Sequence, residues 1–125
     1  MINYIKILNN KTIKIYETRE IKVLSLSFEK YINDLLLNDL TTYTGRIEAI
    51  KKKYNYRKLV PIYINDTICF IPLENKEYNS IYINVYSVYK IIYDKIIFID
   101  GSSLLIYKNL QTISNNINRA RGIKK

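Results

Sequence analysis

The hydrophobic period of this chain changes twice along its length, and these changes limit the folds that it can adopt. In residues 2–26 apolar and polar side chains alternate, as they do in half-buried strands. Apolar residues then recur with the spacing of one helix face, at Phe28, Tyr31, Ile32, Leu35 and Leu36. From Pro61 onward, short runs rich in Ile, Val and Tyr return. Strands, then helices, then strands predict an α+β fold.

The turns and caps divide these regions into elements. Strands are predicted at residues 2–8, 12–16, 21–26, 61–64, 68–71, 81–93, 95–99 and 103–107. Ser27 is placed to cap the first helix, and a more basic second helix is predicted over residues 45–54. Pro72 marks a strand end or a sheet edge. Residues 74–80 are predicted to form a polar loop, and Asp100-Gly101 is predicted to form a hairpin turn. A last helix carries Leu110, Ile113, Ile117 and Ala120 on one face.

The expected fold is therefore an antiparallel, β-rich single domain over residues 1–125, with a central helical insertion and a closing C-terminal helix. The formal net charge of +9 favours a polyanionic partner, either nucleic acid or an anionic membrane surface. The abundant Ile, Asn, Lys and Tyr are also the residues whose codons an AT-rich genome prefers. The placement of the lysines is therefore more informative than their number.

The residue types needed for catalysis are scarce. The chain has no histidine and one cysteine, which excludes a Ser-His or Cys-His nucleophile pair and an internal disulfide. Cys69 lies between Ile68 and Phe70, where we expect a buried apolar side chain. There is no Gly-rich phosphate loop, no run of about 18 apolar residues and no signal-peptide pattern. We expect no enzyme, no metal or other cofactor, no membrane contact and a cytoplasmic location.

Residues 44–58 hold the densest positive charge, with one acidic residue, Glu48, among Arg46, Lys51, Lys52, Lys53, Arg57 and Lys58. Helical phase puts Ile47, Ile50 and Tyr54 inward and the charges outward, where they can neutralise phosphates. Arg46 is the candidate for insertion into a narrow minor groove, and Gly45 for close approach of the backbone to phosphate. The alternative interpretation of this segment is a solvated helix face.

A second basic group, Arg119, Arg121, Lys124 and Lys125, ends the chain, and its alternative interpretation is a solubilising tail. We predict that Gly45, Arg46, Lys51, Lys52, Lys53, Arg57, Lys58, Arg119 and Arg121 bind DNA.

Six segments occur in an informative order: TTYTGR at 41–46, VPI at 60–62, FIPL at 70–73, YI at 82–83, IFIDG at 97–101 and SNNINRA at 114–120. In this order they resemble motifs of the bacterial competence transcription factor family, the ComK-like proteins. The resemblance implies a transcriptional activator that binds paired elements of AT-rich double-stranded DNA, largely through the minor groove. It also implies a homo-oligomer, associated with the nucleoid, that turns on genes for DNA uptake.

The chain departs from the family pattern at three places. Tyr82 stands where the family has Trp, and Leu59-Val60 replace a more polar segment. The family's C-terminal extension does not follow Lys125, which argues against control by an adaptor and a protease. Two alternatives remain open: a LytTR-like DNA-binding regulator, and a degenerate protein-interaction module without its own DNA binding.

Overall fold

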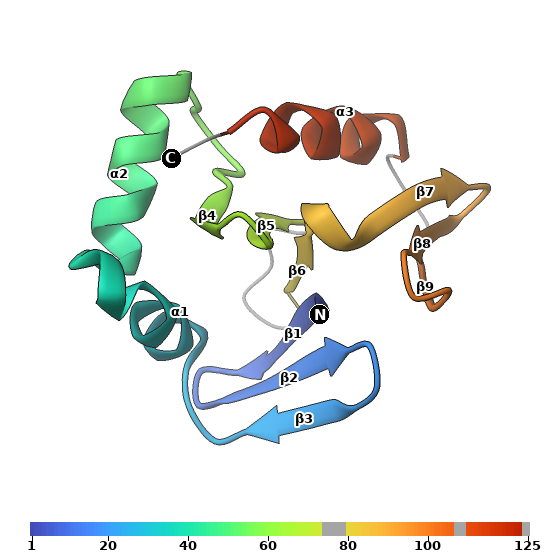
Figure 1. Cartoon of the computed structure of the whole chain (residues 1–125), viewed down its shortest axis with the longest axis horizontal. Coiled ribbons are helices and arrows are strands. Elements are labelled where there is room, and N and C mark those ends of the chain that lie inside the picture. The colour runs from blue at the N-terminus through green and yellow to red at the C-terminus, as the bar shows by residue number, and fades with distance from the viewer. Residues whose placement is uncertain (74–79, 107–109, 124–125) are drawn as a thin grey trace.

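The computed structural model describes residues 1–73, 80–106 and 110–123, and it has the expected α+β fold (Figure 1). The strands are β1 (Ile2–Asn9), β2 (Thr12–Glu17), β3 (Ile21–Leu24), β4 (Ile62–Asn65), β5 (Ile68–Pro72), β6 (Ile81–Asn84), β7 (Val88–Ile92), β8 (Lys95–Phe98) and β9 (Ser103–Leu105). The helices are α1 (Phe28–Leu36), α2 (Tyr43–Tyr54) and α3 (Leu110–Arg121), with 3-10 helices η1 (Leu37–Asp39) and η2 (Val85–Ser87). No helix in this part of the chain is long and apolar enough to cross a membrane.

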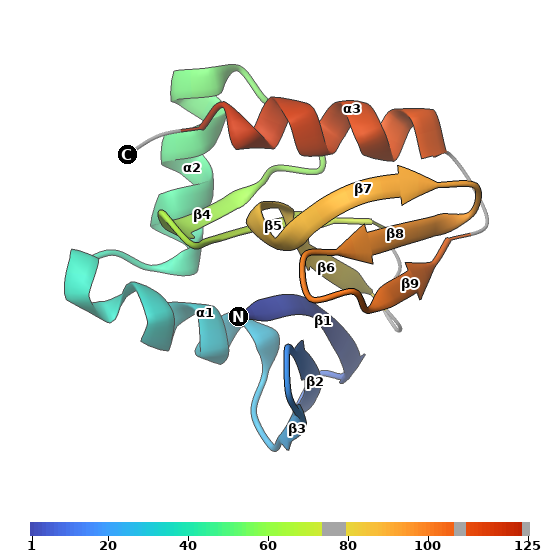
Figure 2. The same cartoon turned by 45° about the vertical axis from the view of Figure 1, so that its right-hand side comes forward.

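The strands form two antiparallel sheets. The larger sheet has the order β3-β2-β1-β6-β5-β4, and the smaller one has the order β7-β8-β9. Because side chains alternate across a strand, the larger sheet has two apolar faces, and each lies in its own core. Ile5, Ile13 and Ile15 pack on the α1 side with Ile32, whereas Ile83 packs on the side of the smaller sheet and α3. The helix α3 lies alongside β7 (Figure 2).

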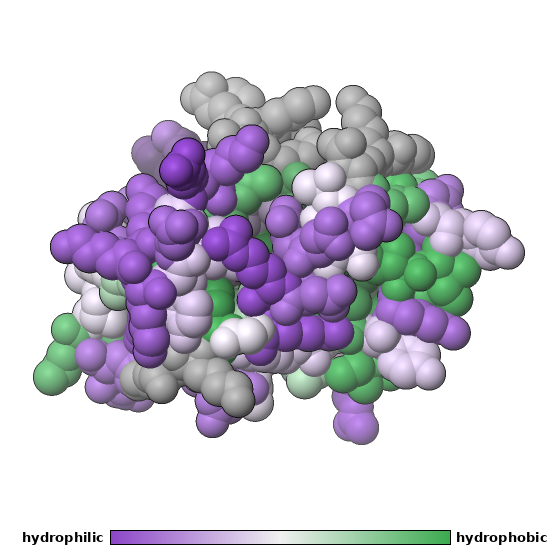
Figure 3. All heavy atoms as spheres, turned by 90° about the horizontal axis from the view of Figure 1, so that it is seen from above, coloured by the Kyte–Doolittle hydropathy of each residue, from purple (hydrophilic) through white to green (hydrophobic). Residues whose placement is uncertain are grey.

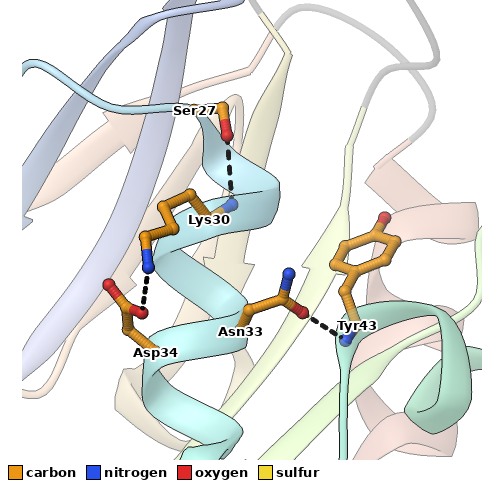
Figure 4. A network of polar contacts seen from close by, with 5 residues as sticks. All are labelled: Ser27, Lys30, Asn33, Asp34 and Tyr43. Atoms are coloured by element: carbon orange, nitrogen blue, oxygen red, sulfur yellow. Dashed lines mark hydrogen bonds and ion pairs between the residues drawn. The ribbon is translucent and has the colours of Figure 1, made fainter.

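Side-chain caps place the two central helices. Ser27 Oγ accepts a hydrogen bond from the Lys30 amide at 3.1 Å, which confirms the predicted cap of α1 (Figure 4). Asn33 Oδ1 of α1 accepts one from the Tyr43 amide at 2.7 Å, so α1 holds the first residue of α2. Thr42 caps α2 through the Gly45 amide at 3.2 Å. The helix then crosses the β4 edge, with Ile47 in one core and Ile50 in the other.

Some predicted strands are interrupted or shorter. The predicted strand over residues 81–93 is broken after β6, because Asn84 is completely buried and its amide needs partners there. Its Oδ1 accepts from the Cys69 and Tyr86 amides, and its Nδ2 donates to the carbonyl oxygens of Ile2 and Thr67. The strand predicted over residues 21–26 ends at residue 24.

Pro72 ends β5, as predicted, but β5 is an interior strand, so this proline does not mark a sheet edge. The strand predicted over residues 103–107 ends at residue 105. The loop predicted over residues 74–80 lies mainly outside the described residues.

The predicted hairpin at Asp100-Gly101 is confirmed as β8 and β9, and Gly101 has a φ of 89°. The Asp100 carboxylate accepts from the Ser102 amide at 2.8 Å and from Asn3 Nδ2 of β1 at 2.7 Å. Burial alone would raise the pKa of Asp100, but hydrogen bonds from Ser102 and Asn3 outweigh it and hold the pKa below its ordinary value. This side chain therefore joins the smaller sheet to the larger one.

Candidate nucleic-acid interface

Exposed positive charge gathers where α2 ends and the chain turns back toward β4. The helix ends at Asn55, whose φ of 59° and ψ of 44° are left-handed. Four basic side chains before and after this turn are exposed, and we call them the basic cluster: Lys52, Lys53, Arg57 and Lys58. None of them forms an ion pair with a carboxylate of the described residues. The outward orientation predicted for these four residues is confirmed.

Lys51 contributes less than its neighbours in sequence. It is half-buried, and its Nζ lies 3.7 Å from a carboxylate oxygen of Glu48 one turn earlier. The pair is exposed to solvent, so it adds little stability. It nevertheless provides a local counter-charge, which leaves the basic cluster as the unneutralised part of the predicted segment.

Arg46 was predicted to face outward and enter a minor groove, and the structure contradicts that orientation. Its guanidinium donates to Asp39 at 2.6 Å, and only 11% of the side chain is exposed. The guanidinium carbon also lies 6.0 Å from the centre of the Tyr63 ring. Helical phase placed Arg46 on the same flank of α2 as Lys53. At the first turn of α2, η1 and β4 cover this flank and Arg46 with it, whereas at the last turn the flank is exposed.

Gly45 is explained by packing within the cap. Its φ is not left-handed, so the glycine is not needed for an unusual backbone conformation. A Cβ at this position would lie 2.9 Å from Thr41 Oγ1, too close for an ordinary contact. A side chain at this position would therefore require the Thr41 hydroxyl to move.

The two C-terminal arginines hydrogen-bond to main-chain carbonyl groups of the fold and remain exposed, and their binding to DNA stays a prediction. Arg119 donates to the carbonyl oxygens of Tyr54 at 3.0 Å and Asn55 at 3.4 Å, so it caps the end of α2. Its guanidinium carbon lies 3.8 Å from the centre of the Tyr56 ring. Arg121 donates to the carbonyl oxygens of Val85 and Val88. The residues predicted with them at 124 and 125 lie outside the described residues.

The capping contact of Arg119 brings α3 beside the basic cluster. A surface hollow separates the segment of residues 55–59 from α3, and Arg57, Lys58 and Arg119 line it together with Thr112 and Asn116. Figure 3 looks down on α2 and α3 and shows mostly hydrophilic side chains over both. Three cationic groups around this hollow can hold an anionic oxygen ligand such as a phosphate.

The remaining chemistry of the described residues is limited. Cys69 is fully buried, as predicted, and burial raises the pKa of its thiol to about 12. The thiol is therefore protonated at neutral pH and packs as an apolar side chain. No group of three or more His, Cys, Asp or Glu side chains that could hold a metal ion occurs among the described residues.

The exposed surface of α3 carries polar side chains that are not among the predicted site residues. Its outward side carries the amides Gln111, Asn115 and Asn118, at intervals of four and three residues. The spacing of these three amides, on the helix face opposite the apolar one, was the sequence signal that could have identified them.

Comparisons of the chain with models of protein families, with curated proteins and with solved structures give no match.

Proposed function

We propose that this chain binds double-stranded DNA and acts as a transcriptional regulator of the competence transcription factor type, at AT-rich promoter elements of genes for DNA uptake. The observation that carries the proposal is the exposed basic cluster beside α3. Phosphates neutralised by such a cluster release their counterions, which drives binding. We further propose that the protein acts on the nucleoid in the cytoplasm, as a homo-oligomer.

The distribution of ion pairs supports a ligand for the basic cluster. The ion pairs formed within the described residues involve Lys22, Lys30, Arg46 and Lys51. Within the part of the chain that the structure describes, the cluster has no carboxylate partner, although carboxylates are present there that could have been placed opposite it. Like charges held close together without a counter-charge repel one another and destabilise a fold. A bound polyanion would neutralise this repulsion, which supports a polyanionic partner for the cluster.

Helix stabilisation explains only part of the cluster. Basic residues in the last turn of a helix interact favourably with its dipole, and this accounts for Lys52 and Lys53. Arg57 and Lys58 follow the left-handed turn at Asn55 and lie outside the helix, where the dipole effect has fallen off. Their charge points to a function beyond the stability of α2.

The resemblance to the competence factors supports the regulatory part of the proposal. We assign one segment of the resemblance, TTYTGR, a structural role and not a DNA-binding one. The TTYTGR segment supplies the cap, the close-packed glycine and the arginine that pairs with Asp39. In this chain the segment therefore positions α2, and the residues that we propose to contact DNA follow it.

Fluorescence anisotropy with AT-rich and GC-rich duplexes of equal length tests the proposal. We expect tighter binding to the AT-rich duplex, and about tenfold weaker binding to both after Lys52→Ala or Arg57→Ala. Lys22→Ala is the matched control, because β3 lies at the far end of the molecule from the end of α2 (Figure 1). Equal binding by all variants would contradict the proposal.

A different observation favours the second candidate, a protein-interaction module. The strand β3 is an edge of the larger sheet, and Ile21 and Val23 on it are 57% and 59% exposed. Apolar side chains on an open edge favour strand pairing with a second copy of the chain. Under this candidate Val23→Lys converts a dimer into a monomer in sedimentation velocity, and the protein binds neither duplex.

A further inference from the structure

The helix α3 presents a ridge of side-chain amides to solvent. Gln111, Asn115 and Asn118, which we call the amide ridge, lie on one face of the helix and are all exposed. Gln111 Nε2 donates to Asn115 Oδ1 at 3.0 Å, so the first two amides are already ordered relative to each other. Amides that are free to hydrogen-bond outward are donors and acceptors at once.

A hollow lies along each side of this ridge. On one side Thr112 and Asn116 of α3 face Arg57 and Lys58. On the other side, Asn118 and residues of the opposite α3 flank face β7, where Lys90 is exposed. The ridge therefore stands between two grooves in the protein surface, and each groove has a basic side chain on its outer wall.

Neither helix stability nor codon use explains the choice of asparagine over lysine at positions 115 and 118. Asparagine is a poor helix former, whereas lysine is a good one and is encoded by equally AT-rich codons. The exposed surface of α2 carries Lys52 and Lys53, whereas α3 has glutamine or asparagine at its exposed positions 111, 115 and 118. The helix α3 also has no acidic residue that would repel a polyanion.

We propose that, in the DNA complex of the proposed function, α3 enters the major groove and the amide ridge reads adenine. This departs from the minor-groove binding that the resemblance implies, since Arg46, the predicted minor-groove residue, is paired with Asp39. An α-helix with its side chains is about 10–12 Å across, and the major groove is about 12 Å wide. Adenine presents there the N7 acceptor and the N6 donor, which one Asn or Gln amide can bind together. The backbones on both sides of the groove then meet Arg57 and Lys58 on one wall and Lys90 on the other.

Modified bases test this inference separately from DNA binding itself. The probe is an AT-rich duplex of about 21 base pairs, two helical turns, in which adenine is replaced by 7-deazaadenine or by 3-deazaadenine. The first analogue removes the N7 acceptor from the major groove, and the second removes the N3 acceptor from the minor groove. We expect 7-deazaadenine to weaken binding about tenfold and 3-deazaadenine to leave it unchanged.

The double variant Asn115→Ala/Asn118→Ala completes the test. Alanine favours the helix, so the variant should stay folded, which circular dichroism checks. We expect it to bind AT-rich, GC-rich and 7-deazaadenine duplexes equally, while Lys90→Ala weakens binding to all three by the same factor. Sensitivity to 3-deazaadenine alone, or to neither analogue, would overturn the major-groove inference and leave the proposed function standing. Failure of the wild-type protein to bind any duplex would overturn both.

Discussion

The guanidinium of Arg46 donates to the carboxylate of Asp39 across 2.6 Å, and this contact fastens the first turn of α2 to the 3-10 helix before it. The arginine Nε is buried and has no hydrogen-bond partner in the structure, and the contact with Asp39 is made by Nη2. The basic cluster lies at the opposite end of the same helix. Arg46 thus sets the position from which the cluster projects.

Replacing Arg46 with Ala should lower the free energy of unfolding by about 2–3 kcal/mol, because it removes a largely buried guanidinium and its ion pair with Asp39. Urea unfolding measures the loss. The double variant Arg46→Ala/Asp39→Ala should be less destabilised than the sum of the two single variants. Additive losses would show that the pair does not stabilise the fold.

Arg119→Ala should lower the free energy of unfolding by about 1–2 kcal/mol, since it removes a charged donor from the last carbonyl groups of α2 and a contact with Tyr56. Lysine can keep one donor but not the stacked guanidinium, so Arg119→Lys should recover only part of the loss. An unchanged denaturation midpoint for Arg119→Ala would mean that α3 does not support the end of α2.

Gly101→Val should destabilise the β8–β9 hairpin by about 1 kcal/mol or more, because the φ of 89° is costly for a β-branched residue. A Cβ at this position would meet no atom within 4 Å, so the cost is conformational and not steric. Gly101→Asn is the matched control, since Asn tolerates left-handed φ, and it should melt closer to the wild type. Equal melting temperatures for Val and Asn would contradict the turn geometry.

Acid should weaken the junction between the two sheets at Asp100. Its pKa is lower in the folded protein than its ordinary value, so the ionised carboxylate favours the fold. This stability is present above the unfolded pKa and is lost as pH falls through the folded pKa. Denaturant unfolding from neutral pH to about pH 3 should show the difference between wild type and Asp100→Asn shrinking in acid. A constant difference would argue against the hydrogen bonds from Ser102 and Asn3.

The elements that local sequence determines were predictable. Ser27 before an amphipathic run marks the start of α1, and Asp100-Gly101 between apolar runs marks a hairpin. Helical phase also predicted the exposure of Lys52 and Lys53, because the apolar stripe of α2 fixes which side faces solvent.

The main-chain contacts of Arg119 and Arg121 and the position of the amide ridge could not be predicted in the same way. The partners of Arg119 are main-chain carbonyl groups about 65 residues earlier in the chain, and carbonyl groups leave no sequence pattern. Asn84 interrupts a β-rich run for a similar reason, since the groups that it satisfies belong to three separate strands and turns. The hollows beside α3 exist only after β7 and residues 55–59 have folded against it.

The salt dependence of DNA binding tests the central claim most directly. The measurement is the slope of log Kobs against log salt concentration for one AT-rich duplex, with wild type and with the variant Lys52→Ala/Lys53→Ala/Arg57→Ala/Lys58→Ala. Each neutralised phosphate contributes about 0.9 to the slope, so removing the basic cluster should reduce it by about 3–4 units. A wild-type protein that does not bind the duplex at low salt, or a variant with the wild-type slope, would contradict the assignment of the cluster as the DNA-binding surface.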